Sequence, residues 1–191
     1  MKHSIKAIIL ACLVSASSFA GMNESRQFTR SNQSAIPATR RSRALLRVVA
    51  AEKRVALKLE EVHALIASAS RRHGVPTALV KSIVATESNF RSEAISSRGS
   101  IGLMQLRPST ARQYGADARV PAQNIDAGTR YLRFLIERYR HTSSPLKNVI
   151  AAYNAGYGAV DRYHGVPPFR ETRGYVNRVL ALMQQYQSES A

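Results

Sequence analysis

A single acidic side chain, Glu87, stands where the sequence pattern would otherwise place an apolar residue. It follows Ile83 by four positions and Val80 by seven, so a helix would carry its carboxyl group on the face directed at the core. Apolar neighbours disfavour the charged form of a carboxyl group, which raises its pKa and lets it hold a proton for donation to a leaving oxygen. A buried ion pair with an arginine, or a helix that ends early, would explain the same pattern.

The histidines and glycines indicate no cofactor. His63, His73, His141 and His164 lack the spacing of metal ligands, and no helical histidine pair with a neighbouring acid suggests zinc. The chain also lacks a glycine loop that would cradle phosphate and a serine nucleophile elbow. We therefore expect neither a metal nor a nucleotide cofactor.

Hydrophobic periodicity places Glu87 within a series of helices. Apolar residues at helical spacing predict helices over residues 55–73, 76–87 or 76–89, 124–139, 146–153 and 175–185. Asn124 is the expected N-cap of the third of these helices. Glycines, serines and prolines break the stretch 91–123 into turns and short helices. Because period-two alternation is nearly absent, we expect an all-α fold with little or no sheet.

Three segments of the sequence stand in a specific order. They are Glu87–Phe90 (ESNF), Ser96 with Gly99–Ala111 (GSIGLMQLRPSTA), and Ala151–Gly156 (AAYNAG). Together they resemble the catalytic domain of the soluble lytic transglycosylases, relatives of goose-type lysozyme. The resemblance covers roughly residues 60–185 and includes the stretches 124–132 and 171–176.

The resemblance implies a lysozyme-like helical domain with a groove for alternating N-acetylmuramic acid and N-acetylglucosamine. Glu87 matches the family's single catalytic acid. Positions associated with the groove, or with support of the acid, are matched by Ser96, Met104, Gln105, Tyr153, Asn154, Glu171 and Tyr175. The chain departs from the family at Ser100, where alanine is usual, and at Arg107, where methionine is common. Neither change removes a group that the chemistry needs.

Several of these residues also have ordinary structural explanations. The Gln105 amide could bind an N-acetyl group or satisfy the irregular backbone near it, and Ser96 could bind sugar or cap a turn. Tyr153 could be a core aromatic residue and Asn154 a helix C-cap. A carboxylate such as Glu171 is favoured at the start of a helix whatever the protein does. Tyr175, one turn later, could belong to the core or to the groove wall.

The sequence offers only one acidic residue, Glu87, in a setting that suits catalysis, and this number bears on the mechanism. Most glycosidases use two carboxylates, whereas Asp117, Asp126 and Asp161 lie among turns or polar helix faces. The resemblance implies that Glu87 protonates the glycosidic oxygen and then, as a base, deprotonates the muramic 6-hydroxyl, which closes a 1,6-anhydro ring. Such an enzyme is a lyase.

Two alternatives to this activity remain. A goose-type lysozyme activity would use water in place of the 6-hydroxyl. A non-catalytic wall-binding protein, an accessory of a secretion or conjugation apparatus, would only grip the glycan.

The charge of the chain favours anionic partners. Its 191 residues include 28 basic and 12 acidic ones, for a net charge of +16. Nucleic acid, anionic lipid and acidic wall polymers all suit such a chain. We expect peptidoglycan strands as the partner and no nucleic acid, because the N-terminus predicts export.

Residues 1–20 have the layout of a signal peptide. Lys2 and Lys6 precede the apolar stretch Ala7–Val14, and Ser18-Phe19-Ala20 forms a small-residue cleavage pattern. The apolar stretch is too short for a spanning helix, so no transmembrane segment should remain after cleavage. A helix of the domain, or lipid attachment at Cys12, is the alternative. The expected location is the periplasm or cell envelope.

The rest of the chain divides into a basic segment and one domain. Residues 21–43 are rich in serine, glutamine and arginine, and residues 44–58 begin to show helical apolar spacing, so residues 21–54 are predicted to be a flexible linker or a lead-in helix. Residues 55–187 form the predicted catalytic domain. Cys12 is the only cysteine, so a mature chain would have neither a disulfide nor a thiol nucleophile.

Overall fold

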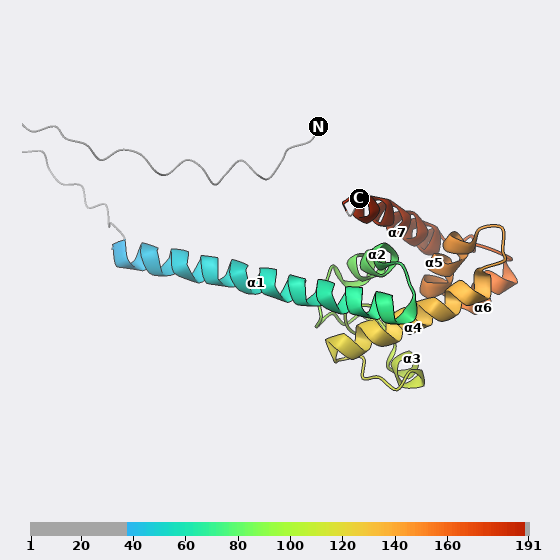
Figure 1. The fold of residues 1–191 in the computed structure, drawn as a ribbon, viewed down its shortest axis with the longest axis horizontal. Coiled ribbons are helices and arrows are strands. Elements are labelled where there is room, and N and C mark those ends of the chain that lie inside the picture. Colours follow the sequence, from blue (N-terminus) through green and yellow to red (C-terminus); the bar gives the residue numbers. More distant parts are fainter. Residues whose placement is uncertain (1–37, 190–191) are drawn as a thin grey trace, which may run out of the picture. The chain divides into compact units, whose positions relative to one another are not determined.

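The structure is a computed structural model that describes residues 38–189. Within its first helix, side chains are described at residues 43, 45 and 47–49 and from residue 58 onward. The predicted signal peptide, Cys12 and the linker up to residue 37 lie outside the described residues. Helices in the described part are α1 (Ala38–His73), α2 (Thr77–Ser88), α3 (Pro108–Gln113), α4 (Pro121–Tyr139), α5 (Pro145–Ala155), α6 (Tyr157–Arg162) and α7 (Arg170–Ser188) (Figure 1). Contacts within the chain separate residues 1–41 from residues 42–191, and α2–α7 all belong to the second unit.

The all-α prediction is confirmed. Within residues 38–189 the extended structure is limited to isolated bridges that pair Ile101 with Ile95 and with Leu106. Residues 44–58 are helical and continue directly into the predicted helix 55–73, so the predicted domain start falls inside α1. Helix α6 was not predicted from the sequence, because a six-residue helix is too short to develop an apolar stripe.

Prolines define where several helices begin. Pro108, Pro121 and Pro145 occupy the first turn of α3, α4 and α5. Proline suits this position because its missing N–H would have no partner inside the helix anyway. At the C-terminal end of α1, Gly74 takes a left-handed conformation (φ 63°), which ends the helix before Pro76 and α2.

The core forms around α2. Its residues Leu79, Val80 and Ile83 are fully buried, and α2 packs on α7, which in turn packs on α5. Helix α5 also contacts α4 and α6. Burying each large aliphatic side chain contributes about 1.5–3 kcal/mol, so α2 is fixed in position along its whole apolar face. The C-terminal end of α2 therefore has a well-defined place in the fold.

The prediction that Asn124 caps α4 is wrong. Helix α4 begins at Pro121, and Asn124 lies one turn inside it with its side chain completely buried. Its Oδ1 accepts a hydrogen bond from the Met104 N–H, and its Nδ2 donates to the carbonyls of Ile101 and Ala118, each at 2.8 Å. The amide therefore ties α4 to the loop that precedes α3.

Gly102 makes this close approach to Asn124 possible. Its φ of +80° is a conformation that glycine adopts without strain. A Cβ atom at this position would lie 2.5 Å from the Asn124 Nδ2. The loop and the amide thus fit together only because residue 102 has no side chain.

We predict that Asn124→Ala lowers the free energy of unfolding by about 3 kcal/mol, because the Met104 N–H and the Ala118 carbonyl lose their partner and the Ile101 carbonyl keeps only its bond from the Leu106 N–H. Urea denaturation measures the change. Asn177→Ala, at an exposed position on α7, is the control and should change stability by less than about 0.5 kcal/mol. Equal effects of the two substitutions would contradict the role given to the Asn124 amide.

Candidate active site

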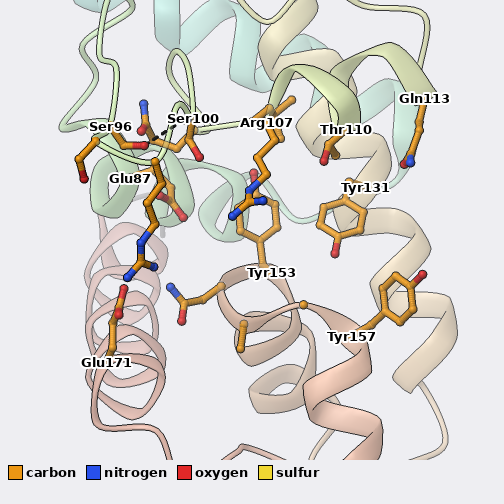
Figure 2. A pocket seen from close by; sticks show the side chains of 17 residues that line it. Glu87, Ser96, Ser100, Arg107, Thr110, Gln113, Tyr131, Tyr153, Tyr157 and Glu171 are labelled. Atoms are coloured by element: carbon orange, nitrogen blue, oxygen red, sulfur yellow. Dashed lines mark hydrogen bonds between the residues drawn. The ribbon is translucent and has the colours of Figure 1, made fainter.

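A cleft of about 760 Å³ opens beside the C-terminal end of α2. Its walls come from the loop after α2, from α3 and α4, from the end of α5 and from the start of α7. The lining residues are Glu87, Ser96, Ser97, Arg98, Ser100, Gln105, Leu106, Arg107, Thr110, Gln113, Tyr131, Tyr153, Asn154, Ala155, Gly156, Tyr157 and Glu171. In Figure 2, Glu87, Ser96 and Glu171 lie at one end, Tyr131 and Tyr157 at the other, and Tyr153 between them.

Glu87 reaches the cleft from the last turn of α2. The helix ends because Asn89 adopts a left-handed conformation (φ 50°) and its N–H bonds the Ala85 carbonyl. The Glu87 Oε1 accepts a hydrogen bond of 2.7 Å from the Tyr175 hydroxyl on α7. The carboxyl group is therefore held from behind while it borders the cleft.

Burial raises the pKa of Glu87 above its ordinary value of 4.5. The hydrogen bond from Tyr175 and the positive charge of Arg178 oppose this effect and stabilise the carboxylate. Desolvation is the larger influence, so the pKa of Glu87 is shifted upward and the protonated form is more favoured than in a solvated glutamate. A group in this setting can both give up a proton and take one back.

Tyr153 forms the floor of the cleft beside Glu87. Its hydroxyl donates a hydrogen bond of 2.8 Å to the Met104 carbonyl, which fixes the end of α5 against the loop before α3. Burial and the nearby Glu87 carboxylate raise the pKa of Tyr153 well above its ordinary value. The phenol therefore stays protonated and neutral at physiological pH.

A tight turn at residues 96–100 supplies the hydroxyl groups at one end of the cleft. The Ser96 Oγ accepts a hydrogen bond of 2.9 Å from the Ser100 N–H, and the Ser96 N–H donates to the Ser100 carbonyl. The Ser96 side chain is thus a turn-forming group that also lines the cleft.

The Gln105 side chain is engaged with the backbone around it. Its Nε2 donates to the carbonyls of Ala94 and Gly102 at 3.0 and 2.9 Å, and its φ is +48°. The Nε2 of Gln105 therefore satisfies the irregular backbone near it, which is one of the two roles expected for this amide. Its Oε1 has no hydrogen-bond partner within residues 38–189 and is the atom that can accept from a ligand in the cleft.

Two further polar groups come from α5 and α7. The Asn154 Oδ1 accepts a hydrogen bond of 2.9 Å from the buried Thr172 hydroxyl, which orients the amide at the cleft edge. Glu171 is exposed in the first turn of α7. Its carboxylate is solvated, unlike that of Glu87.

Met104 and Tyr175 are not among the residues that line the cleft, so of the two roles expected for these positions the structure favours support of the acid over contact with substrate. The side chains of Met104 and Tyr175 are 0% and 4% exposed. Met104 packs where a Cβ on Gly128 would come within 2.5 Å of its sulfur, and Tyr175 reaches Glu87 from within the core. Both residues support the site from behind.

One wall of the cleft was not predicted from the sequence. Tyr131 falls within the predicted helix 124–139, where its spacing is that of an apolar residue, but it lines the cleft and packs against Tyr153, with ring centroids 5.6 Å apart. Tyr157, 45% exposed, follows Gly156 and belongs to the unpredicted helix α6. Arg98, Arg107, Thr110 and Gln113 also line the cleft. The available sequence signal for Tyr157 was an aromatic residue directly after the glycine that ends α5.

Within residues 38–189, no group of three histidine, cysteine or acidic side chains is arranged to hold a metal ion. No helix in the same part of the chain is long and apolar enough to cross a membrane.

Comparison with known proteins identifies relatives of the region that contains the cleft. Residues 64–175 match the family described as the transglycosylase SLT domain. The chain is 37% identical over 124 residues to membrane-bound lytic murein transglycosylase C of Histophilus somni, a match that covers 56% of this chain and 34% of the relative. The protein of the same name from Mannheimia succiniciproducens is 35% identical over 142 residues, covering 64% and 38%. The matches span about a third of these relatives' length.

Two solved structures resemble this one. The lytic transglycosylase Slt of Pseudomonas aeruginosa, solved as an inactive glutamate-to-glutamine mutant, is 30% identical with a TM-score of 0.57. The 70 kDa soluble lytic transglycosylase of Escherichia coli is 28% identical with a TM-score of 0.60, and has also been solved in complex with bulgecin A. Each match covers 66% of this chain and 24% of the other.

We predict that Glu87→Gln changes how stability depends on pH. Because the folded-state pKa of Glu87 is raised, the stabilisation from its proton is complete below the unfolded-state pKa and is lost as pH rises through the folded-state pKa. Glutamine avoids that loss. The free energy of unfolding of the variant relative to wild type should therefore increase between about pH 4 and pH 7. Urea titrations at both pH values measure it, and a pH-independent difference would contradict the burial effect.

We also predict that Tyr175→Phe raises the pKa of Glu87 further, because the lost hydrogen bond favours the charged carboxylate. An NMR titration of carbon-13-labelled glutamate side chains measures the pKa. Tyr157→Phe is the matched control, since that tyrosine lines the cleft without bonding Glu87. An unchanged or lower Glu87 pKa in Tyr175→Phe would refute the prediction.

Proposed function

Since this chain belongs to the transglycosylase SLT domain family, we propose that it is a lytic transglycosylase that cleaves the glycan strands of bacterial peptidoglycan. The bond cleaved is the β-1,4 linkage between N-acetylmuramic acid and N-acetylglucosamine. The observation that carries the proposal is the desolvated Glu87 carboxyl group, which borders the cleft and is hydrogen-bonded from behind by Tyr175. The names of the relatives, lytic murein transglycosylases, support the same activity.

Glu87 is the proposed general acid. Its raised pKa favours the protonated carboxyl group more than in a solvated glutamate, and the proton passes to the glycosidic oxygen as the bond to the muramic anomeric carbon breaks. The N-acetyl group of the muramic residue stabilises the cationic centre that forms. The inactive glutamate-to-glutamine mutant named for the Pseudomonas aeruginosa relative supports a glutamate in this role.

The same carboxyl group then acts as the base. After donating its proton, the Glu87 carboxylate is stabilised by the Tyr175 hydroxyl and by the Arg178 charge. It removes the proton of the muramic 6-hydroxyl, whose oxygen bonds to the anomeric carbon of the same sugar. The proton returns to Glu87, the product carries a 1,6-anhydro ring, and no water is consumed.

The second acid that lines the cleft is assigned to binding. Glu171 is exposed and lies in the first turn of α7, where the helix dipole favours a carboxylate. In water its charge is stabilised already, so it lacks the setting of a general acid. We propose that Glu171, with Ser96, Asn154 and the Gln105 Oε1, hydrogen-bonds the sugars.

Hydrolysis by an activated water is the alternative reaction. It would require a group that positions a water molecule on the muramic anomeric carbon. The described cleft supplies one desolvated carboxyl group, Glu87, and its other lining acid is solvated, which favours attack by the substrate's own hydroxyl. The two reactions give products that differ by one water.

The cell envelope is the proposed location. The predicted signal peptide and the word "membrane-bound" in the relatives' names both support it. Peptidoglycan is the proposed partner, and association with a secretion or conjugation apparatus stays a prediction.

The expected product of purified peptidoglycan digestion is a set of muropeptides with 1,6-anhydromuramic ends, identified by mass spectrometry. Glu87→Gln should lower the cleavage rate at least about 100-fold, because general acid–base catalysis is lost, with the fold retained by circular dichroism. Muropeptides with only reducing muramic ends would sink the transglycosylase assignment, and wild-type cleavage by Glu87→Gln would sink the assignment of the acid.

Two other glutamates provide matched controls for that substitution. Glu61→Gln, at an exposed position on α1 away from the cleft, should cleave at the wild-type rate. Glu171→Gln should raise KM more than it lowers kcat, because a binding contact is lost while the acid remains.

A further inference from the structure

The N-terminal half of α1 carries large apolar side chains in water. We call residues 43–59 the α1 arm. Leu45, Val48 and Val49 are 66%, 53% and 52% exposed, and Leu59 is 38% exposed. Figure 1 shows no other described helix beside this part of α1. Single exposed apolar residues are ordinary, but four on one helix form a feature that needs an explanation.

These apolar residues continue the face by which α1 joins the core. Val48 and Val49 follow Leu45 at spacings of three and four, and Leu59, Val62 and Ile66 fall on the same side of the helix. Val62 and Ile66 are 7% and 1% exposed. The apolar stripe that is buried at the C-terminal end of α1 therefore continues along the α1 arm, where its described side chains are exposed.

The opposite side of the arm is basic. Arg43, Arg47 and Lys58 share one face of the helix, turned away from the Leu45 stripe, and all three are exposed. By sequence, residues 43–59 contain five basic residues and one acidic residue. A helix with an apolar stripe and a basic polar face is typical of binding in the interface of an anionic membrane.

We propose that the α1 arm lies on the surface of an anionic lipid bilayer, with Leu45, Val48, Val49 and Leu59 in the interface and the basic side chains against lipid headgroups. The arm lies on the bilayer and does not span it, because 17 residues of helix carrying five basic side chains are too short and too charged to cross. None of the arm's described side chains lines the cleft, and the proposal does not depend on the proposed function.

Each of the two other candidate occupants complements only one face of the arm. A second copy packed stripe against stripe would cover the apolar side chains but would leave both basic faces, which point away from the stripes, uncompensated. A glycan strand or anionic wall polymer would satisfy the arginines but offers little apolar surface to cover Leu45 and Val48. An anionic bilayer complements both faces of the arm at once.

Vesicle sedimentation of the full chain tests the proposal. The chain should bind vesicles of phosphatidylcholine with phosphatidylglycerol, bind pure phosphatidylcholine weakly, and lose affinity as salt increases. Leu45→Asp combined with Val49→Asp should weaken binding at least about tenfold. Leu146→Asp, at an exposed apolar position on α5, should bind as wild type. Arg43→Ala combined with Arg47→Ala should also weaken binding about tenfold.

Tryptophan fluorescence gives a second measurement, because the chain contains no tryptophan. Val48→Trp should shift its emission to the blue and resist quenching by iodide when anionic vesicles are added. Arg47→Trp, one residue along the helix on the basic face, should remain accessible to iodide. Cleavage of soluble glycan by these variants should equal that of the wild type, which separates this proposal from the proposed function.

Several outcomes would overturn the proposal. They are equal binding by the Leu45/Val49 double variant and wild type, quenching of Val48→Trp unchanged by vesicles, and light scattering that shows a dimer lost in the double variant. If only the arginine variant lost binding, the arm would bind vesicles through surface charge alone. That result would also overturn the proposed insertion of the apolar stripe.

Discussion

The hydrogen bond between Tyr175 and Glu87 joins side chains 88 residues apart, and the cleft is organised around it. It forms only because α2 packs against α7, which brings the end of one helix to the second turn of the other. Leaving a carboxyl group among apolar side chains is costly, and one well-placed phenol reduces that cost without removing it. The site thus keeps an acid whose two protonation states are close enough in energy to be exchanged during a reaction.

The walls of the cleft are irregular in backbone conformation yet firmly held. Asn89, Phe90 and Gln105 all have positive φ values, conformations that cost energy in residues with side chains. The surrounding structure compensates for them. The Ser88 hydroxyl donates to the Leu103 carbonyl at 2.9 Å, and the buried Asn124 amide bonds the same loop from α4. Two helices therefore hold the loop in a shape that its own sequence would not favour.

Local patterns predicted much of the fold and the position of Glu87 on it. The apolar spacing of α2 was enough to place Glu87 on the helix face that is directed at the core. The prediction for Asn124 was wrong because an asparagine near the start of a helix is typical of an N-cap. Two of its hydrogen-bond partners, Met104 and Ile101, lie 20 and 23 residues away in the sequence, and no local pattern indicates them. The sequence could not separate Tyr131 in the cleft from a core tyrosine, since both occupy the same stripe.

The contact between Gly102 and Asn124 has a consequence for how this domain can evolve. A side chain at residue 102 would collide with the amide, and a residue at 124 without an amide would leave the Met104 N–H and the Ala118 carbonyl without a partner. A substitution at residue 102 or at residue 124 alone should lower stability. Across relatives, glycine at 102 and asparagine at 124 should therefore occur together, and a substitution at one should accompany a change in the conformation of the whole loop.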